Sequence, residues 1–472
     1  MKVSEFNQKK QYSEGSGVSV IVDPNIRIKL NEYGMYEETT HLSEDQELHP
    51  NVEYVSPYLN EKVNESDISD LLYKNIEGIH YDESLGFYLS LIAGYVSEGD
   101  YRLQASSGGL GTWVFKELFE RDLIDGVIHV KRNKDPESEI MFKYDISRSI
   151  EEIKEGAKTK YYPLELSEVL TLVKENPGRY AIIGIPSFIM AVRLLAQVEP
   201  IIKERILFTI GLICGHQKSS KFGEAIAWQA GIKPHDLISI DYRKKIPDVS
   251  AGNYGVELTG RINNEEVTFI KPMQGMVVAD WGKGYFKQVS SDYTDDVMNE
   301  TADITIGDAW LPQYTDDWKG NSIAIVRHPI IQNIIDEGLR DDKLKLDMMS
   351  VEQVFASQAA HFRHTRDELS YRLAKKDQEN VWRPNLRVKA SMDTPYLRQK
   401  VQDLRIHIAA QSHIAYKKAV ELQDFSYFEK EMKRLTKQYM QVYYAIQVQR
   451  RGVLGSFKVI FKKLFSKLKL KK

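Results

Sequence analysis

The segment Ser106–Gly111, Ser-Ser-Gly-Gly-Leu-Gly, has residues suited to binding an anion at the start of a helix. Glycines let a ligand approach backbone N–H groups, and the helix dipole favours a group such as phosphate at that end. Leu110, Val114 and Leu118 then recur at helical spacing. The segment is neither a GxGxxG fingerprint nor a Walker A loop. A flexible turn capped by serine therefore explains it as well as a phosphate site does.

Two further glycine-bearing turns follow apolar runs, at residues 184–187 and 211–216. Ligands of α/β sheets bind beyond the carboxyl ends of strands, so turns of this kind can face one pocket. Cys214 lies in the second turn, which makes it a weak candidate nucleophile. That role needs an activating base such as His216. The alternative is that Cys214 is a small buried apolar side chain.

The elements that must position these turns are short apolar runs alternating with helical patterns between residues 80 and 245. The runs Leu123–Val130, Tyr180–Ile185 and Arg205–Ile213 predict buried strands of an α/β domain. Residues 250–335 are more strand-rich, including Glu266–Ile270 and Ser322–Arg327. Residues 340–450 have a charged, helical pattern that is interrupted near Pro384 and Pro395.

The composition excludes several classes of site. Cys214 is the only cysteine in 472 residues, so the chain cannot form an internal disulfide, a cysteine-based zinc site or an iron–sulfur cluster. Eleven histidines are present, but no HExxH or CxxC motif marks a metal site. The balance of 64 basic against 67 acidic residues gives no general attraction to nucleic acid. Neither the polar N-terminus nor the stretch 181–198 has the pattern of a signal peptide or membrane span, so we expect a cytoplasmic chain.

Taken in order, several segments make the chain similar to the beta subunits of coenzyme F420 hydrogenases and dehydrogenases. The resemblance covers most of residues 10–335, and it rests on SSGGLGTWVFKELFERDLIDGVIHV, GAKTKYYPLELSEVL, GIPSFIMAVRLL, RILFTIGLICGHQKSSKF, ADITIGDAWLP and GNSIAIVRHPIIQNII. It implies a flavoprotein that passes electrons between FAD, iron–sulfur clusters and a deazaflavin or similar acceptor. Related reductases act on chlorophyll precursors. The run ADITIGDAWLP and the helical region after residue 340 look most like members encoded among exopolysaccharide genes.

The chain departs from the family pattern at its cluster ligands. The family's ferredoxin-like run of cysteines corresponds here to Ser13, Ser16, Ser19 and Asp23, with Pro24 kept. Ser56, Ser291, Thr294 and Ser187 stand at further cysteine positions of the family. Hydroxyls and a carboxylate are poor ligands for such clusters, so their loss together predicts a protein without an iron–sulfur cluster.

The resemblance also implies which residues would hold a flavin. The family's nucleotide-binding turns correspond here to Ser107, Gly108, Gly109, Thr159, Lys160, Gly184, Pro186, Ser187, Gly211 and Cys214, with Lys221, Asp308 and Arg327 as further polar candidates. Lysine and arginine would neutralise a pyrophosphate, and N–H groups of the first helix would bind it. Solvated charges on an ordinary surface are the alternative.

The C-terminal segment 457–472 has the pattern of an amphipathic helix with a basic face. Its apolar residues, Phe457, Ile460, Phe461, Leu464, Phe465 and Leu468, share one helical face, and lysines occupy most of the remainder. This pattern is typical of peripheral binding to an anionic membrane surface, here the inner face of the membrane. A helix docked on the protein's own core or on a partner is the alternative.

The sequence therefore predicts a mixed α/β (α+β) fold in four parts. They are a degenerate ferredoxin-like module without cluster ligands (1–75), a flavoprotein-like α/β core (76–335), a helical extension (336–450) and a basic amphipathic tail (451–472). Two functions follow from it. One is a cluster-free, FAD-dependent oxidoreductase at the membrane, acting in exopolysaccharide biosynthesis. The other is a non-catalytic scaffold for polysaccharide-biosynthesis proteins.

Overall fold

A computed structural model describes residues 1–135 and 138–469, with side chains described as far as residue 450. Its centre is an eight-stranded sheet in the order β15-β5-β14-β13-β9-β8-β6-β7. The strands are β5 (Ser90–Val96), β6 (Gly126–Arg132), β7 (Phe142–Ser147), β8 (Tyr180–Gly184), β9 (Ile206–Leu212), β13 (Ile304–Asp308), β14 (Ser322–Val326) and β15 (Leu344–Met348). The mixed α/β fold is confirmed, and the three predicted buried strands are β6, β8 and β9.

The middle of this sheet is parallel and its flanks are antiparallel. β13, β9, β8 and β6 run in the same direction, whereas β7, β14, β5 and β15 pair antiparallel with their neighbours. Parallel strands are buried on both faces, which explains their continuous apolar runs. The carboxyl ends of β8, β9 and β13 therefore meet at one edge, where the two glycine-bearing turns were expected to lie.

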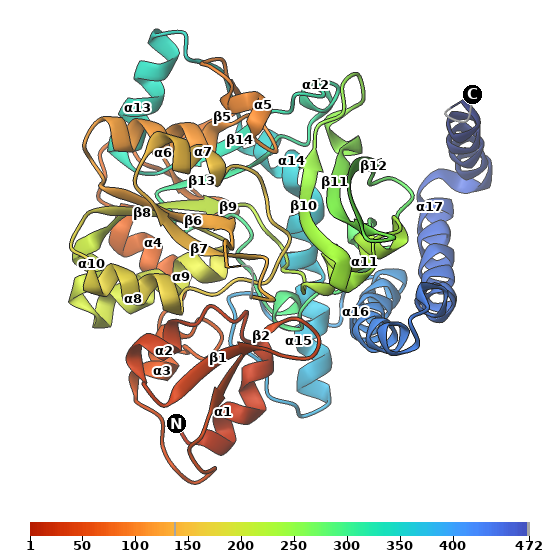
Figure 1. Ribbon diagram of the computed structural model, residues 1–472, viewed down its shortest axis with the longest axis horizontal. Coiled ribbons are helices and arrows are strands. Elements are labelled where there is room, and N and C mark those ends of the chain that lie inside the picture. The colour runs from red at the N-terminus through yellow and green to blue at the C-terminus, as the bar shows by residue number, and fades with distance from the viewer. Residues whose placement is uncertain (136–137, 470–472) are drawn as a thin grey trace.

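Helices cover both faces of the sheet (Figure 1). One face packs against α6 (Leu110–Glu120), α7 (Ile150–Glu155) and α13 (Pro329–Arg340). The other packs against α8 (Ser167–Glu175), α9 (Pro186–Val198), α10 (Pro200–Arg205) and α14 (Val351–Phe362). Fully buried side chains such as Trp113 of α6 and Ile335 of α13 fill the first interface. Because α13 runs through residue 335 and β15 pairs with β5, the sheet continues past the expected boundary at residue 335.

The N-terminal module lies below the carboxyl edge of the sheet in Figure 1. It comprises α1 (Val3–Lys9), η1 (Lys10–Tyr12), α2 (Val18–Val22), β1 (Ile26–Leu30), β2 (Tyr36–Thr40), α3 (Asn51–Val55) and α4 (Glu65–Tyr73). β1 and β2 form an antiparallel hairpin over a small core that includes Phe6, Ile26 and Val52. Val18 and Val55 join the core beneath α8 and α9, which fixes the module against the sheet. A second hairpin, β3 (His80–Asp82) with β4 (Gly86–Tyr88), follows.

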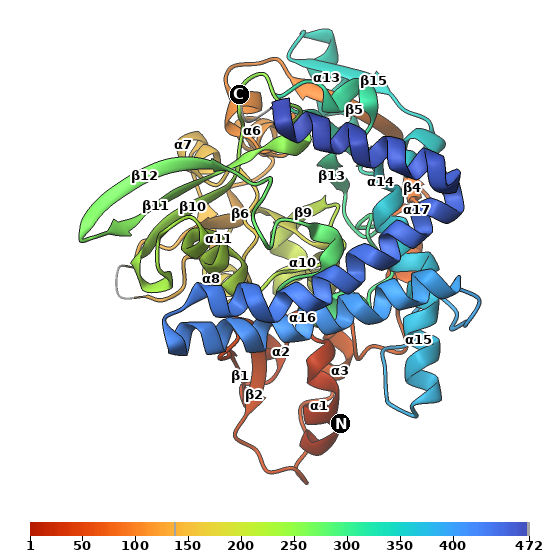
Figure 2. The same cartoon turned by 90° about the vertical axis from the view of Figure 1, so that its right-hand side faces the viewer.

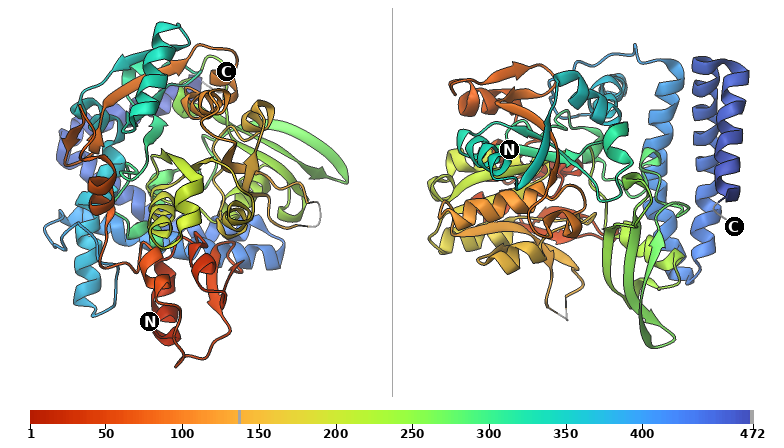
Figure 3. Two further views of the ribbon diagram at one scale, coloured as in Figure 1. Left: turned by 90° about the vertical axis from the view of Figure 1, so that its left-hand side faces the viewer. Right: turned by 90° about the horizontal axis from the view of Figure 1, so that it is seen from above.

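A second layer of structure flanks the sheet on the side of its carboxyl edge. It contains the antiparallel strands β10 (Leu237–Lys244), β11 (Gly255–Ile262) and β12 (Glu265–Pro272) and the helices α11 (Lys221–Gln229), α15 (Leu369–Gln378), α16 (Tyr396–Leu422) and α17 (Phe425–Lys469). Short elements connect them: α5 (Tyr101–Gln104), η2 (Pro234–Asp236), η3 (Ala251–Asn253), η4 (Trp281–Lys283), η5 (Ser290–Asp292), α12 (Pro312–Thr315) and η6 (Arg363–Asp367). Figures 2 and 3 show α16 and α17 side by side along the outside.

Aromatic residues hold these C-terminal helices to the second sheet. Phe286 stacks on Phe428 of α17 at 5.7 Å, and its ring meets Tyr416 of α16 edge-on at 5.5 Å. The predicted membrane-binding residues 457–472 lie outside the residues whose side chains are described. Within the described residues, no helix combines the length and apolar character needed to span a membrane.

Candidate functional site

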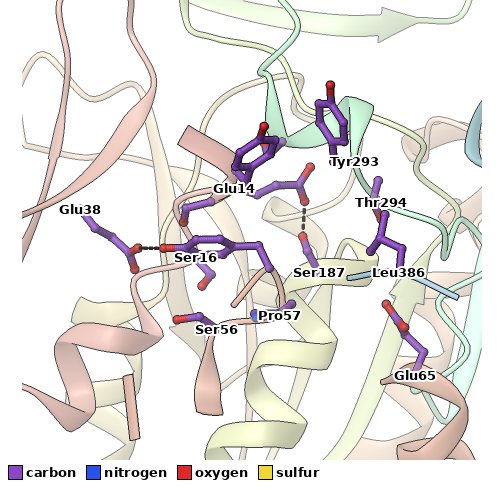
Figure 4. A pocket seen from close by; sticks show the side chains of 14 residues that line it. Glu14, Ser16, Glu38, Ser56, Pro57, Glu65, Ser187, Tyr293, Thr294 and Leu386 are labelled. Carbon is purple, nitrogen blue, oxygen red and sulfur yellow. Dashed lines mark hydrogen bonds between the residues drawn. The ribbon is translucent and has the colours of Figure 1, made fainter. Parts of the chain in front are cut away.

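Hydroxyl groups from the expected cluster-ligand positions converge on one cavity of about 50 Å³ between the N-terminal module and the sheet (Figure 4). Five of these positions line it: Ser13, Ser16, Ser56, Ser187 and Thr294. Three tyrosines and three glutamates complete most of the wall: Tyr12, Tyr58, Tyr293, Glu14, Glu38 and Glu65. The cavity is therefore lined by oxygen donors, and its volume suits a few water molecules.

Glu14 joins three parts of the chain at this cavity. The hydroxyls of Ser187 at the start of α9 and of Ser291 in η5 both donate to its carboxylate, the second at 3.0 Å. Ser291 Oγ in turn accepts the backbone N–H of Gln217 at 2.9 Å. Burial raises the pKa of Glu14, and the two hydroxyl donors offset only part of that effect. A buried carboxyl group here replaces the environment that the family gives to a cluster.

A second buried carboxyl group, Glu38, accepts the remaining hydroxyls. Ser19 donates to it, and Tyr58 donates at 3.2 Å. Burial raises the pKa of Glu38, as it does for Glu14. Asp23 faces away from this network and instead accepts the backbone N–H groups of Asn25 and His49 at 2.9 and 2.8 Å.

These donors do not fit an iron–sulfur cluster. Such clusters are held by thiolates, whereas every side chain that lines the cavity from an expected ligand position carries a hydroxyl. The side chains described here also include no group of three His, Cys, Asp or Glu residues that could hold a metal ion. The cavity thus retains the position expected for a cluster but not the chemistry.

The glycine-rich turn before α6 is filled by protein. The Ser107 hydroxyl donates to the carbonyl of Asn321 at 2.6 Å, and its own carbonyl accepts Lys245 Nζ at 2.8 Å. Gly109 has a φ of +92°, and a Cβ there would lie 2.8 Å from the Tyr101 carbonyl carbon. Gly108 approaches the carbonyl of Gly94 in β5 equally closely. Close packing is therefore sufficient to explain both glycines.

A cationic cleft of about 580 Å³ opens beside this turn. It is lined by five lysines, Lys154, Lys158, Lys160, Lys244 and Lys245, against two acidic residues, Glu155 and Asp241. The N–H of Thr159 donates to Ser106 Oγ at 2.8 Å, which joins the two predicted turns at its wall. Burial lowers the pKa of Lys160 to about 8 and that of Lys245 to about 7. An anion in the cleft would relieve this cost, because it stabilises the charged lysines.

Asp308, a predicted polar candidate at the end of β13, is held by Arg243. The two side chains form a bidentate ion pair at 2.9 and 3.0 Å, and the guanidinium lies 4.4 Å from the centroid of the Tyr254 ring. Arg243 also reaches the carbonyl of Ser106 at 3.4 Å. This pair ties β10, β13 and the glycine-rich turn together beside the cleft.

The other predicted residues are engaged in the fold. Asn299 Nδ2 donates to the carbonyl of Gly184 at 3.0 Å, and a Cβ on Gly211 would lie 2.5 Å from Asn299. Pro186 is buried at the start of α9. Lys221 pairs with Glu224 at 2.7 Å.

Arg327 and Cys214 are both placed away from reactive chemistry. Arg327 is fully buried and donates to the carbonyls of Leu85 and Ala302. The Cys214 thiol faces the carbonyl of His216, not its ring, at 3.5 Å. Burial raises the pKa of this thiol to about 12, so it stays protonated and is a poor nucleophile.

Sequence reasoning missed Glu14, Glu38, Arg243 and Lys245. The first two stand in ordinary polar contexts, so nothing local marks them as buried carboxyl groups. The run Tyr-Arg-Lys-Lys at residues 242–245, at the end of a predicted strand, was a signal for the other two.

The fold and this site define a doubly wound α/β protein with a cationic cleft near the carboxyl end of β13. The chain belongs to the family of coenzyme F420 hydrogenase/dehydrogenase beta subunits. Residues 91–171 match the N-terminal part of the beta subunits of this family, and residues 178–352 match their C-terminal part. Together the two matches cover more than half of the chain.

Two individual proteins are similar to it. The F-type subunit of the F(420)H(2) dehydrogenase of Methanosarcina mazei is 28% identical over 110 residues, which are 23% of this chain and 30% of that relative. This chain thus spans less than a third of that relative's length. A chain in the xenon-derivatised F420-reducing [NiFe] hydrogenase complex from Methanosarcina barkeri has a TM-score of 0.47 and 16% identity, over 67% of this chain and 99% of that chain.

Proposed function

We propose that this protein is a flavin-dependent oxidoreductase that works without an iron–sulfur cluster, with FAD as the cofactor. The cationic cleft carries the proposal. Its volume of about 580 Å³ is in the range of ligand pockets, and it lies where Ser106 and Thr159 join the two turns that the family resemblance associates with a nucleotide.

The residues of the cleft fit the pyrophosphate of FAD. Lys160 and Lys245 are partly buried cations with lowered pKa values, so a bound dianion would favour their charged forms. Arg243 supports the wall through its ion pair with Asp308. FAD, when bound, supplies hydride transfer chemistry. The role of the chain is to hold the anionic end and to exclude other anions.

The hydroxyl-lined cavity determines the kind of electron donor. Because its oxygen donors do not fit a cluster, no relay of single electrons passes through the N-terminal module. We therefore propose a two-electron donor or acceptor that meets the flavin directly, namely a nicotinamide, a deazaflavin or an organic substrate.

A scaffold role is the second candidate, and one observation favours it. The glycine-rich turn is filled by Asn321 and Lys245, so the family's nucleotide-binding glycines serve packing in this chain. In either role we propose that the protein acts in exopolysaccharide biosynthesis with polysaccharide-biosynthesis proteins as partners. We also propose attachment to the inner face of the membrane through residues 457–472. Neither proposal depends on the cleft.

Flavin titration of cleft variants tests the enzyme proposal. We expect FAD to quench tryptophan fluorescence on binding, and K160Q with K245Q to weaken its Kd at least tenfold. K143Q, which removes an exposed lysine paired with Glu168, is the matched control and should bind FAD normally. Equal affinity in all variants, or no binding to the wild type, would leave the scaffold role.

A further inference from the structure

A second group of cations lies buried beyond the carboxyl end of β9, separate from the lysines of the cleft. Lys218, Lys287 and Arg405 are only 2%, 2% and 7% exposed. They come from the turn after β9, from the segment before η5 and from α16. His216, His361 and His364 complete this group, which we call the basic cluster. Arg405 acts electrostatically on each of the other five members, so the six groups face one another.

Acidic residues compensate only part of this charge. Asp292 pairs with Lys287 and lies 3.8 Å from both Arg372 and His364. Lys218 Nζ instead donates to the carbonyl of Tyr285 at 2.6 Å and lies 4.8 Å from the centroid of the Trp281 ring. Asp280 also acts on Lys218, but it is paired with Lys283 at 3.6 Å. One fully buried carboxylate therefore serves several cations.

Arg405 forms no ion pair with the described side chains. Asp292 interacts with it only at longer range, and Arg405 Nε is buried without a hydrogen-bond partner among the described residues. Buried polar groups in native proteins nearly always have partners, and an unpaired buried charge is strongly unfavourable. A guanidinium in this environment therefore favours an anion as its partner.

Further polar atoms around the basic cluster also lack partners. His216 Nε2, His361 Nδ1, Gln217 Oε1 and Gln288 Nε2 are buried without a hydrogen bond to any described residue. Gln217 and Gln288 are 8% and 4% exposed. Burial and the neighbouring cations lower the pKa of Lys218 and bring that of Lys287 to about 7. Both the unused hydrogen-bonding capacity and the uncompensated charge are concentrated in the same place.

We propose that the basic cluster is a binding site for a phosphoryl group. A carboxylate presents two oxygens in a plane, which one guanidinium can satisfy. Here donors converge from four separate segments, which suits a tetrahedral dianion with several acceptor oxygens. His361, His364 and Arg405 all follow residue 352, where the family match ends. The site is thus completed by the C-terminal part of this chain.

The phosphoryl group has two sources, free phosphate or the phosphate of a nucleotide. The basic cluster shares no residue with the lining of the lysine cleft, so this proposal does not depend on the flavin proposal. Competition separates the two sources. FMN that displaces phosphate, while riboflavin does not, assigns the site to a nucleotide phosphate. Phosphate that binds unaffected by FMN assigns it to the free anion.

The test is phosphate binding by the full-length protein and by Arg405→Met, measured by calorimetry and by melting temperature with inorganic phosphate and pyrophosphate as probes. We expect the wild type to be stabilised by either anion. R405M should bind at least tenfold more weakly, and its melting temperature without anion should be at or above that of the wild type, because the substitution removes an unpaired buried charge. R383M, at the exposed pair with Asp377, is the control and should respond like the wild type.

Two results would overturn the proposal. One is a wild type that neither anion stabilises. The other is an R405M variant that melts lower than the wild type yet responds equally to phosphate, which would make Arg405 structural only. If R405M does not fold, H361L replaces a less buried member of the basic cluster, and the same tenfold criterion applies. K245Q, in the cleft, should leave phosphate binding at the basic cluster unchanged even if it abolishes FAD binding.

Discussion

Replacing Arg243 with methionine tests whether the Arg243–Asp308 ion pair holds the cleft together. Arg243 is 5% exposed, so R243M leaves Asp308 without its bidentate partner beside an apolar wall. Breaking a buried pair by removing one member costs about 3–5 kcal/mol. The Asp308 side chain is 22% exposed and can recover some hydration, which favours the lower end. The contact with Tyr254 adds roughly 0.5–1 kcal/mol. We therefore expect a loss of about 3–4 kcal/mol.

Urea unfolding followed by tryptophan fluorescence measures this loss, and Trp310 near the pair is a local reporter. The double variant R243M/D308N should be more stable than R243M by about 2 kcal/mol, because it removes the unpaired carboxylate. The control K143M breaks an exposed pair and should change stability by less than about 1 kcal/mol. A loss below about 1 kcal/mol for R243M, or a double variant no more stable than R243M, would refute the reasoning.

Three further predictions follow from named contacts. Gly109→Ala should lose about 1–3 kcal/mol in urea unfolding because of its positive φ and close approach to Tyr101, whereas Gly111→Ala, with ordinary contacts, should be neutral or stabilising; equal effects would contradict this. Glu14 has a raised pKa, so the folded protein holds a proton that the unfolded chain releases above about pH 4.3, and stability should fall as pH rises. E14Q should flatten that fall between pH 5 and 8, and an unchanged slope would count against it. Lys245 has a pKa lowered to about 7, so between about pH 7 and 10 the unfolded chain holds more protons and stability should rise with pH. K245M should lack this contribution when urea midpoints at pH 7 and 9 are compared, and an identical rise in both proteins would argue against a buried cation.

Much of the sheet was predictable from the sequence because its strands are short apolar runs bounded by turns. β8 and β9 illustrate this, since both are parallel strands buried on two faces. The extent of the sheet was harder to predict. β15 alternates in burial at the edge of the sheet and follows a helix, so its pairing with β5 depends on a contact between residues far apart in the chain.

The site was less predictable because its chemistry depends on burial. The positions of the expected cluster ligands come from spacing, and the structure brings five of them to one cavity. The carboxyl group of Glu14 meets Ser187 and Ser291, which are 173 and 277 residues away, and no local pattern encodes such contacts. The glycines before α6 have the same limit. Sequence cannot distinguish a glycine that admits a phosphate from one that admits the carbonyl of Gly94.

The most direct test of the central claim is the visible absorption spectrum of the full-length protein after anaerobic supply of FAD, iron and sulfide, with bound nucleotide and iron then quantified. We predict a flavin spectrum near one FAD per chain, no iron–sulfur shoulder and no bound iron after desalting. A protein that takes up iron and sulfide would contradict the cluster-free assignment. A colourless protein that retains no flavin would contradict the oxidoreductase proposal.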